Sequence, residues 1–171
     1  IFCQNEEDFA QLVESRLVAP QQLELLPGSG VDLDRFNPAL RGAHTGPYRF
    51  LYAGRMLADK GLNELIAAVR AINASSVACN LWLSGFADVE NVSSISRQQL
   101  ATWGEEPGIE WLGPSESMEN IYGAVDCVVL PSYREGMPRS FLEAGAMGLP
   151  VVATDVPGCR NVVQNGFNGL L

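Results

Sequence analysis

The sequence is poor in histidine and lysine: His44 is the only histidine and Lys60 the only lysine among 171 residues. A zinc site or a histidine-based catalytic triad needs more partners than one histidine in a Gly/Pro-rich loop offers. The net charge is −9, because 20 acidic residues outnumber 11 basic ones. This balance argues against a nucleic-acid partner, since phosphate backbones are bound by clustered lysine and arginine.

Long apolar runs are also missing, and cysteines are few. No run reaches the ~18 apolar residues of a membrane-spanning helix, and the first residues lack the basic region and apolar stretch of a signal peptide. The four cysteines are far apart, without Cys-x-x-Cys spacing. Three of them lie in apolar, strand-like runs, where cysteine behaves as a small hydrophobe. We therefore expect buried, reduced thiols rather than disulfides or metal ligands.

Short apolar runs alternate with longer amphipathic stretches. The runs predict strands at 50–53, 81–83, 109–112, 127–130 and 151–153. Apolar residues at helical spacing predict helices between them, with faces formed by Leu62, Leu65, Ile66, Val69 and Ile72, by 95–103, by Met118, Ile121, Tyr122 and Val125, and by 139–147. A last unit begins at Asn161, followed by an Asn165-Gly166 turn.

This alternation is typical of an α/β fold, in which a Rossmann-like parallel sheet carries helices on both faces. Ligands bind such sheets beyond the carboxyl ends of the strands. We therefore expect ligand-binding residues in the loops that follow the strands, at 54–61, 84–92, 113–116 and 131–139.

Residues 1–38 differ from the rest of the chain. They predict a strand at 1–4, a helix at 6–13 and a strand at 23–26, which together cannot bury a core. We therefore expect 1–38 to be the C-terminal remnant of a preceding domain, 39–47 a linker and 48–171 the main domain. The chain lacks an initiator methionine and stops on Gly169-Leu170-Leu171 in mid-pattern, so we expect both ends to be cut.

The segment from Gly54 to Gly61 directly follows a predicted strand and precedes a helix. A glycine allows close approach of backbone to a ligand, and a helix N-terminus offers free N–H groups. With Arg55 and Lys60 added, the segment suits a diphosphate, although it is neither the dinucleotide fingerprint nor a Walker motif. The alternative is a glycine turn with two solvated cations.

The segment 131–144 forms a second such loop, after the buried strand at 127–130. Pro138 suits the first helical position. Glu135 lies on the loop and Glu143 in the first turns of the helix, so they can flank a ligand from two directions. Carboxylates accept charge-assisted hydrogen bonds from sugar hydroxyls. The alternative is that Glu143 stabilises the helix dipole in the first turn and Glu135 is a polar loop residue.

Together the two segments resemble the retaining two-domain (GT-B type) glycosyltransferases, the glycosyl transferases group 1. That family's hallmark is two glutamates separated by seven residues, here Glu135 and Glu143. The segment 54–61 resembles its diphosphate-binding segment, and 28–38 the segment that closes its N-terminal domain, with Gly28-Ser29-Gly30 where many relatives have Pro-Asn-Gly. Residues 148–169 match its closing pattern. The resemblance covers essentially the whole chain and implies that 48–171 is the C-terminal, nucleotide-sugar (donor) binding half of a GT-B fold.

The resemblance also implies roles for individual residues. Glu143 would hold the ribose hydroxyls of a nucleotide diphosphate sugar. Glu135 would contact the donor sugar, helped by the amides of Gly136 and Met137. The catalytic residues would be Arg55, Lys60 and Glu135.

The other roles implied by the resemblance concern the phosphates, the base and the cleft. Arg55 and Lys60 would neutralise the diphosphate, with amides near Arg139 and Ser140 assisting. Gly54 would allow the close approach, and the base edge would lie near Leu112 to Ser115. Gly28 and Gly30 would face the cleft between the domains.

The chemistry expected for such a family member is sugar transfer with retention of configuration. Charge develops on the leaving diphosphate, and preorganised cations and amides stabilise it. Because Arg55 and Lys60 can serve for a divalent ion, we expect no metal and no cofactor beyond the nucleotide-sugar substrate. Glu135 and Glu143 would be binding groups and not the acid–nucleophile pair of a glycosidase.

The resemblance further implies a polysaccharide-building enzyme, a hexosyl- or N-acetylhexosaminyltransferase when full length, with a UDP-sugar as the commonest donor and a glycan or lipid-linked acceptor. We expect a cytoplasmic protein, with peripheral association of the full-length enzyme at the inner face of the membrane left open. The isolated chain should bind donor weakly and transfer nothing. Two alternatives stay open: a nucleotide-sugar epimerase of the same architecture, and a non-catalytic nucleotide-binding α/β module. The missing fingerprint disfavours a nicotinamide-dependent oxidoreductase.

Overall fold

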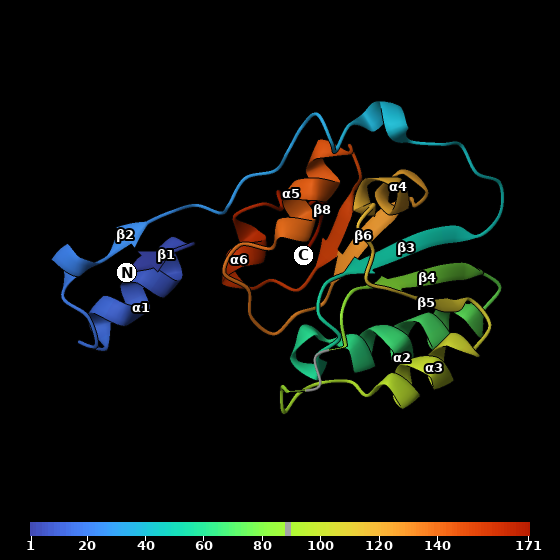
Figure 1. Cartoon of the computed structure of the whole chain (residues 1–171), viewed down its shortest axis with the longest axis horizontal. Coiled ribbons are helices and arrows are strands. Elements are labelled where there is room, and N and C mark those ends of the chain that lie inside the picture. Colours follow the sequence, from blue (N-terminus) through green and yellow to red (C-terminus); the bar gives the residue numbers. More distant parts are fainter. Residues whose placement is uncertain (88–89) are drawn as a thin grey trace.

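The computed structural model describes residues 1–87 and 90–171, and its main feature is a parallel sheet of six strands (Figure 1). The spatial order is β5-β4-β3-β6-β7-β8. The strands span Tyr48–Ala53 (β3), Cys79–Ser84 (β4), Ile109–Gly113 (β5), Cys127–Leu130 (β6), Val151–Ala153 (β7) and Gly169–Leu170 (β8). The α/β fold class predicted from the sequence is therefore confirmed.

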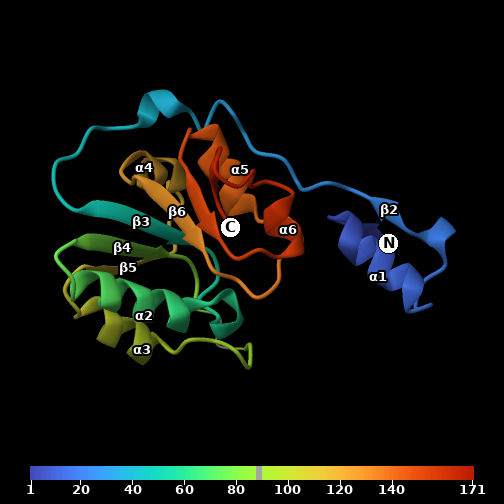
Figure 2. The same cartoon turned by 180° about the vertical axis from the view of Figure 1, so that it is seen from behind.

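Helices connect successive strands and cover both faces of the sheet. Figures 1 and 2 show α2 and α3 on one face and α4 and α5 on the other. The helices span Leu62–Asn73 (α2), Arg97–Gly104 (α3), Met118–Gly123 (α4), Arg139–Ala146 (α5) and Pro157–Arg160 (α6). Among the helices of the described residues, none combines the length and apolarity needed to cross a bilayer.

The strand order reverses direction at β3, the first strand of the sheet. The chain moves from β3 outward through β4 to β5, then returns to pair β6 with the other side of β3. The loops after β3 and β6 therefore leave the same edge of the sheet side by side. A reversal of this kind is where α/β sheets bind ligands.

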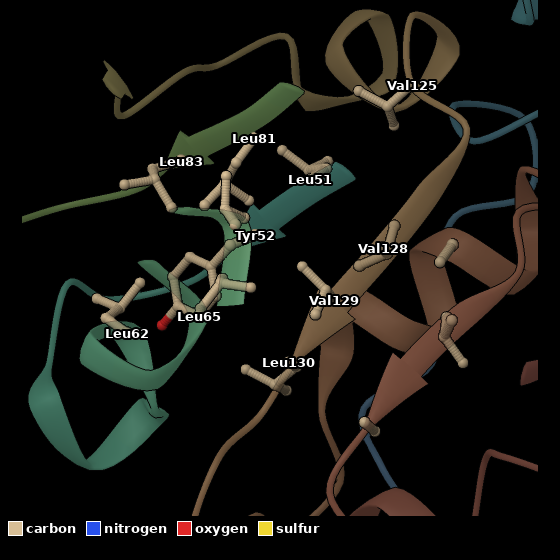
Figure 3. Close-up of a cluster of buried hydrophobic side chains, with 14 of the residues drawn as sticks. Leu51, Tyr52, Leu62, Leu65, Leu81, Leu83, Val125, Val128, Val129 and Leu130 are labelled. Carbon is tan, nitrogen blue, oxygen red and sulfur yellow. The ribbon is translucent and has the colours of Figure 1, made fainter. Parts of the chain in front are cut away.

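The apolar runs of the sequence form the core, as expected. All four residues of β6 are buried. Figure 3 shows the side chains of Val128, Val129 and Leu130 of this strand with those of Leu51 and Tyr52 in β3, and with Leu62 and Leu65 of α2. Ile72 is the exception on the predicted face of α2: it lies in the last turn and is 37% exposed.

Residues 1–26 form a small unit beside the sheet domain. The strands Phe2–Cys3 (β1) and Glu24–Leu25 (β2) pair in parallel, with the helix Glu6–Glu14 (α1) between them. An extended stretch joins this unit to the sheet domain along α5 (Figures 1 and 2). Phe36, which falls within the predicted remnant 1–38, is only 2% exposed and packs edge-on against Tyr122 of the sheet domain at 5.7 Å between ring centroids. The division at residues 38 and 47 stays a prediction.

Several element boundaries differ from the sequence prediction by a few residues, for example β3 and β4, which each begin two residues earlier. Pro138 is the N-cap of α5 and not its first residue. The helix predicted at 95–103 starts two residues later, because the Ser96 hydroxyl caps it by accepting a hydrogen bond from the Gln99 amide. The short helix α6 lies ahead of Asn161, the predicted start of the last unit.

Candidate donor-binding site

The loop after β3 carries the two predicted cations into the site. Gly54 and Arg55 directly follow β3, and a short 3-10 helix, Ala58–Lys60, leads into α2. Gly61 joins the two helices in the left-handed conformation, with φ +74°. A Cβ atom at this position would lie 2.0 Å from the carbonyl oxygen of Pro131, so only glycine allows the loop after β6 to approach this closely.

The loop after β6 is fastened to the loop after β3 by hydrogen bonds. The Tyr133 amide donates to the Asp59 carbonyl at 3.1 Å. The fully buried Ser132 hydroxyl lies 3.1 Å from the Arg134 carbonyl and 3.4 Å from that of Asp59, and Thr154 donates to the Ser132 carbonyl. These contacts fix the positions of the two loops relative to each other.

A salt bridge joins the two loops directly. Lys60 Nζ lies 2.7 Å from Glu135 Oε1, and both side chains are mostly buried, with 19% and 13% of their surface exposed. The ammonium group also lies 3.5 Å from the Arg134 carbonyl. The only lysine of the chain is therefore paired with the first glutamate of the predicted Glu135/Glu143 motif.

Glu143 lies in the second turn of α5, which rules out our alternative of a first-turn residue that stabilises the helix dipole. Its two carboxylate oxygens have different partners. Arg139 Nε lies 3.1 Å from Oε1, and the Tyr122 hydroxyl donates to Oε2 at 2.9 Å. Burial, together with the charge of Glu143, raises the pKa of Tyr122 well above its ordinary value, so this hydroxyl stays a donor at neutral pH.

A second buried tyrosine supports the loop after β3. The Tyr52 hydroxyl donates to the Arg55 carbonyl at 2.6 Å. Its pKa is raised, chiefly by burial and then by the negative charges of Glu135 and Asp59. The buried Tyr52 hydroxyl thus fixes the position of the backbone at Arg55.

Two adjoining cavities lie at this edge of the sheet. The larger has a volume of about 540 Å³ and is lined by Ala53, Gly54, Arg55, Ser84, Gly85, Phe86, Pro114, Ser115, Met118, Arg139, Ser140 and Glu143. The smaller, of about 190 Å³, shares five of these residues and adds Tyr52, Lys60, Leu130, Glu135 and Pro138. Glu143 lines the larger cavity and Glu135 the smaller one, so the two carboxylates lie in adjoining parts of this edge.

Most of the predicted site residues come together here. Gly54, Arg55, Arg139, Ser140, Glu143 and Ser115 line the larger cavity, and Lys60 and Glu135 line the smaller one. Leu112, Gly136 and Met137 are not among the lining residues of either cavity. Gly28 lies against Met137, since a Cβ atom there would be 2.8 Å from Met137 Cγ, whereas Gly30 has open space around it.

Several residues of the site were not singled out from the sequence. Ser84, Gly85, Phe86 and Pro114 lie in loops that the strand pattern marked for inspection, although residues 88 and 89 of the 84–92 loop lie outside the described residues. Tyr122 was predicted only as part of an apolar helix face. Its spacing fits that face, so the sequence carries no signal that its hydroxyl reaches Glu143.

The arrangement suits an elongated anionic ligand. Two cations and the N-terminal turns of α2 and α5 can neutralise phosphates, and the flanking carboxylates can accept hydrogen bonds from hydroxyl groups. A cavity of about 540 Å³ falls in the ~300–1,000 Å³ range of small-molecule sites.

Comparison with known proteins agrees with this geometry. The α-1,3-galactosyltransferase of Escherichia coli named for UDP-Gal and α-D-GlcNAc-diphosphoundecaprenol is 27% identical over 180 residues, which cover 100% of this chain and 46% of that enzyme. The putative colanic acid biosynthesis glycosyltransferase WcaL of Salmonella typhimurium is 31% identical over 150 residues, covering 83% and 36%. The chain thus spans less than half the length of these relatives.

Solved structures show the same fold. The Anabaena protein HepE in complex with UDP-glucose superposes with a TM-score of 0.81 at 19% identity, over 99% of this chain and 48% of HepE. Sucrose-phosphate synthase from Thermosynechococcus elongatus gives a TM-score of 0.80 at 26% identity, over 99% and 44%. The six-stranded sheet is therefore the Rossmann-like half of a GT-B fold. Residues 47–171 match the family model of glycosyl transferases group 1, and the chain belongs to that family.

Proposed function

We propose that the chain is the donor-binding part of a retaining glycosyltransferase that moves a sugar from a UDP-sugar to a glycan or lipid-linked acceptor in polysaccharide biosynthesis. The observation that carries the proposal is the connected site at the strand-order reversal. There Arg55 and Lys60 meet Glu135 and Glu143 across two loops fixed to each other. The names of relatives support the donor class, since one acts from UDP-Gal and HepE was solved with UDP-glucose.

In the proposed mode of binding, the diphosphate lies between Arg55 and Lys60, near the first turn of α5. Glu143 accepts hydrogen bonds from the ribose, and Ser115 lies at the base end of the larger cavity. Glu135, in the smaller cavity, contacts the hydroxyls of the sugar.

Catalysis in this proposal rests on charge stabilisation. Cleavage of the sugar–phosphate bond transfers negative charge to the leaving diphosphate, and Arg55, Lys60 and the amides of α5 stabilise that charge without reorganising. The two cations serve the purpose of a divalent ion, so the proposal needs no metal. The acceptor hydroxyl attacks on the face from which the diphosphate leaves, and a leaving phosphate oxygen takes its proton, so configuration is retained.

The transfer step is proposed for a protein in which an acceptor-binding domain accompanies this chain. We place that protein in the cytoplasm, with peripheral contact at the inner membrane face where the acceptor is lipid-linked. The chain alone should bind the donor weakly and transfer nothing. The relatives named above are transferases and a synthase, which does not favour an epimerase.

Calorimetry tests the proposal most directly. The chain is titrated with UDP, GDP, ADP and UDP-N-acetylglucosamine without divalent metal, beside a Glu143→Gln variant. Binding of UDP in preference to GDP and ADP, abolished by the substitution, is the expected result. Equal binding by the variant, or a preference for another base, would contradict the assignment.

A further inference from the structure

Tyr122 reaches the candidate site from a separate element. It lies on α4, whereas Glu143 lies on α5, and its ring is fully buried against Phe36. The hydroxyl has one proton and two acceptors in reach: Glu143 Oε2 at 2.9 Å and the Ser140 carbonyl at 3.2 Å. The carboxylate is the closer acceptor and carries charge, so it takes the hydrogen bond.

The two partners of Glu143 differ in how firmly they are held. Arg139, on Oε1, is 63% exposed, so its side chain can move when a ligand enters. Tyr122, on Oε2, is fully buried and cannot. The Glu143 side chain itself is only 12% exposed, so its orientation depends on the fixed partner.

We propose that Tyr122 is a positioning residue, whose buried hydroxyl holds Glu143 Oε2 so that the carboxylate presents its remaining acceptor sites to the ribose hydroxyls. The proposal rests on the ribose-binding role proposed above for Glu143. Tyr122 is not among the described residues that line the larger cavity, so it acts through Glu143 and does not touch the ligand.

The raised pKa of Tyr122 agrees with this role, because the phenol keeps its proton at neutral pH and can donate it in a hydrogen bond. Packing requires only the ring. Phenylalanine would fill the same space against Phe36 and would remove only the hydrogen bond.

A double-mutant cycle between protein and ligand tests the inference. The chain and its Tyr122→Phe variant are each titrated with UDP and with 2′,3′-dideoxy-UDP. The unsubstituted chain should prefer UDP on the order of 10-fold, since hydrogen bonds to charged groups are of that strength. The variant should lose most of this preference, by weakening UDP binding while leaving the dideoxy ligand unaffected.

Tyr52→Phe is the matched control. It also removes one buried tyrosine hydroxyl, but from beneath Arg55, so it should change the binding of both ligands by the same factor and leave their ratio intact. If Tyr122→Phe likewise leaves the ratio intact, Tyr122 has only a structural role and the inference is overturned, while the proposed function stands. If the unsubstituted chain does not bind UDP, or does not distinguish the two ligands, the proposed function falls and the inference with it.

Folding of the variants is checked by circular dichroism and thermal unfolding. Should Tyr122→Phe fail to fold, Glu143→Asp decides the matter. It keeps the charge but withdraws the carboxylate from the Tyr122 hydroxyl, so the preference for UDP should fall. A preference retained in full by Glu143→Asp would overturn the inference.

Discussion

Lys60 and Glu135 form a 2.7 Å salt bridge across 75 residues of sequence, between the loops that follow two adjacent strands. Each is the other's ion-pair partner in this structure. A diphosphate that binds Lys60 must share or replace the carboxylate, so ligand binding and this ion pair are coupled.

Substituting Lys60 should therefore weaken the binding of UDP, whereas substituting Glu135 should weaken only the additional binding of the sugar. Lys60→Met should weaken UDP on the order of 10-fold or more, because a cation facing phosphate is lost and Glu135 is left unpaired. Glu135→Gln should leave UDP binding equal or stronger, since Lys60 is released, but should remove the added affinity of UDP-glucose over UDP. Calorimetry of both variants with both ligands measures this, and a Glu135→Gln variant that weakens UDP as much as Lys60→Met does would refute the division of roles.

Gly61 should not tolerate a side chain. Gly61→Ala combines a positive φ with a contact at 2.0 Å to the Pro131 carbonyl oxygen, and should lower the free energy of unfolding by about 3 kcal/mol. Gly166→Ala is the matched control, because Gly166 has a similar φ of +79° and open space around it, and about 1 kcal/mol is expected there. Urea unfolding followed by tryptophan fluorescence gives both values; equal losses would mean that the loops separate without cost.

Asn5 should hold the N-terminal unit against the loop that carries Glu135. It is 2% exposed, caps α1 through the Asp8 amide and donates to the Gly136 carbonyl at 2.9 Å. Asn5→Ala should remove both contacts, and limited proteolysis should then cut within 1–26 several-fold faster. Ser96→Ala removes the same kind of cap from α3 and should leave that cleavage rate unchanged. A rate unchanged in Asn5→Ala as well would show that other contacts hold the unit.

The thiols should be unreactive in the folded chain. All four are free and buried, and burial raises the pKa of Cys127 from 9.0 to about 11 and of Cys159 from 9.0 to about 12. Ellman's reagent at pH 8 should therefore titrate four thiols rapidly only after denaturation. Two rapidly reacting thiols in the folded chain would contradict their burial.

The same pKa shifts set a direction for stability against pH. Unfolded thiols lose their protons near pH 9 while the folded ones keep them. The stability that the buried thiols contribute to the folded chain is therefore fully present below pH 9. It is lost as the pH rises toward the pKa values of the folded thiols. The midpoint of urea unfolding should fall between pH 8.5 and pH 10.5 on these grounds; a rising midpoint would contradict the assignment.

The fold followed from local patterns, because a parallel sheet buries each strand on both faces and so produces continuous apolar runs such as 127–130. The loops that meet at the site were also predictable, since strand ends mark them. Which side chains pair with one another within the site could not be predicted. The ion pair of Lys60 with Glu135 depends on which strands are neighbours, and the strand order is not written in any local pattern.

Tyr122 shows the same limit at the level of one side chain. Its position on the apolar face of α4 was evident from spacing, and the ring does pack in the core. Only the tertiary fold, which places Tyr122 beside α5, brings its hydroxyl to Glu143. Pro138 was misplaced by one position for a different reason, because proline is tolerated at an N-cap as well as at the first helical residue.

The pairing of β3 with both β4 and β6 has a consequence for how the chain acquires its shape during synthesis. The segment β3-α2-β4-α3-β5 contains only neighbouring pairings, so it can assemble as soon as residue 113 is available. The pairing of β3 with β6 instead closes a long stretch of chain and must wait for it. We therefore expect the edge of β3 that pairs with β6 to stay unpaired on the nascent chain until β6 has been synthesised. The loops after β3 and β6 should then come together only in the last stage of folding.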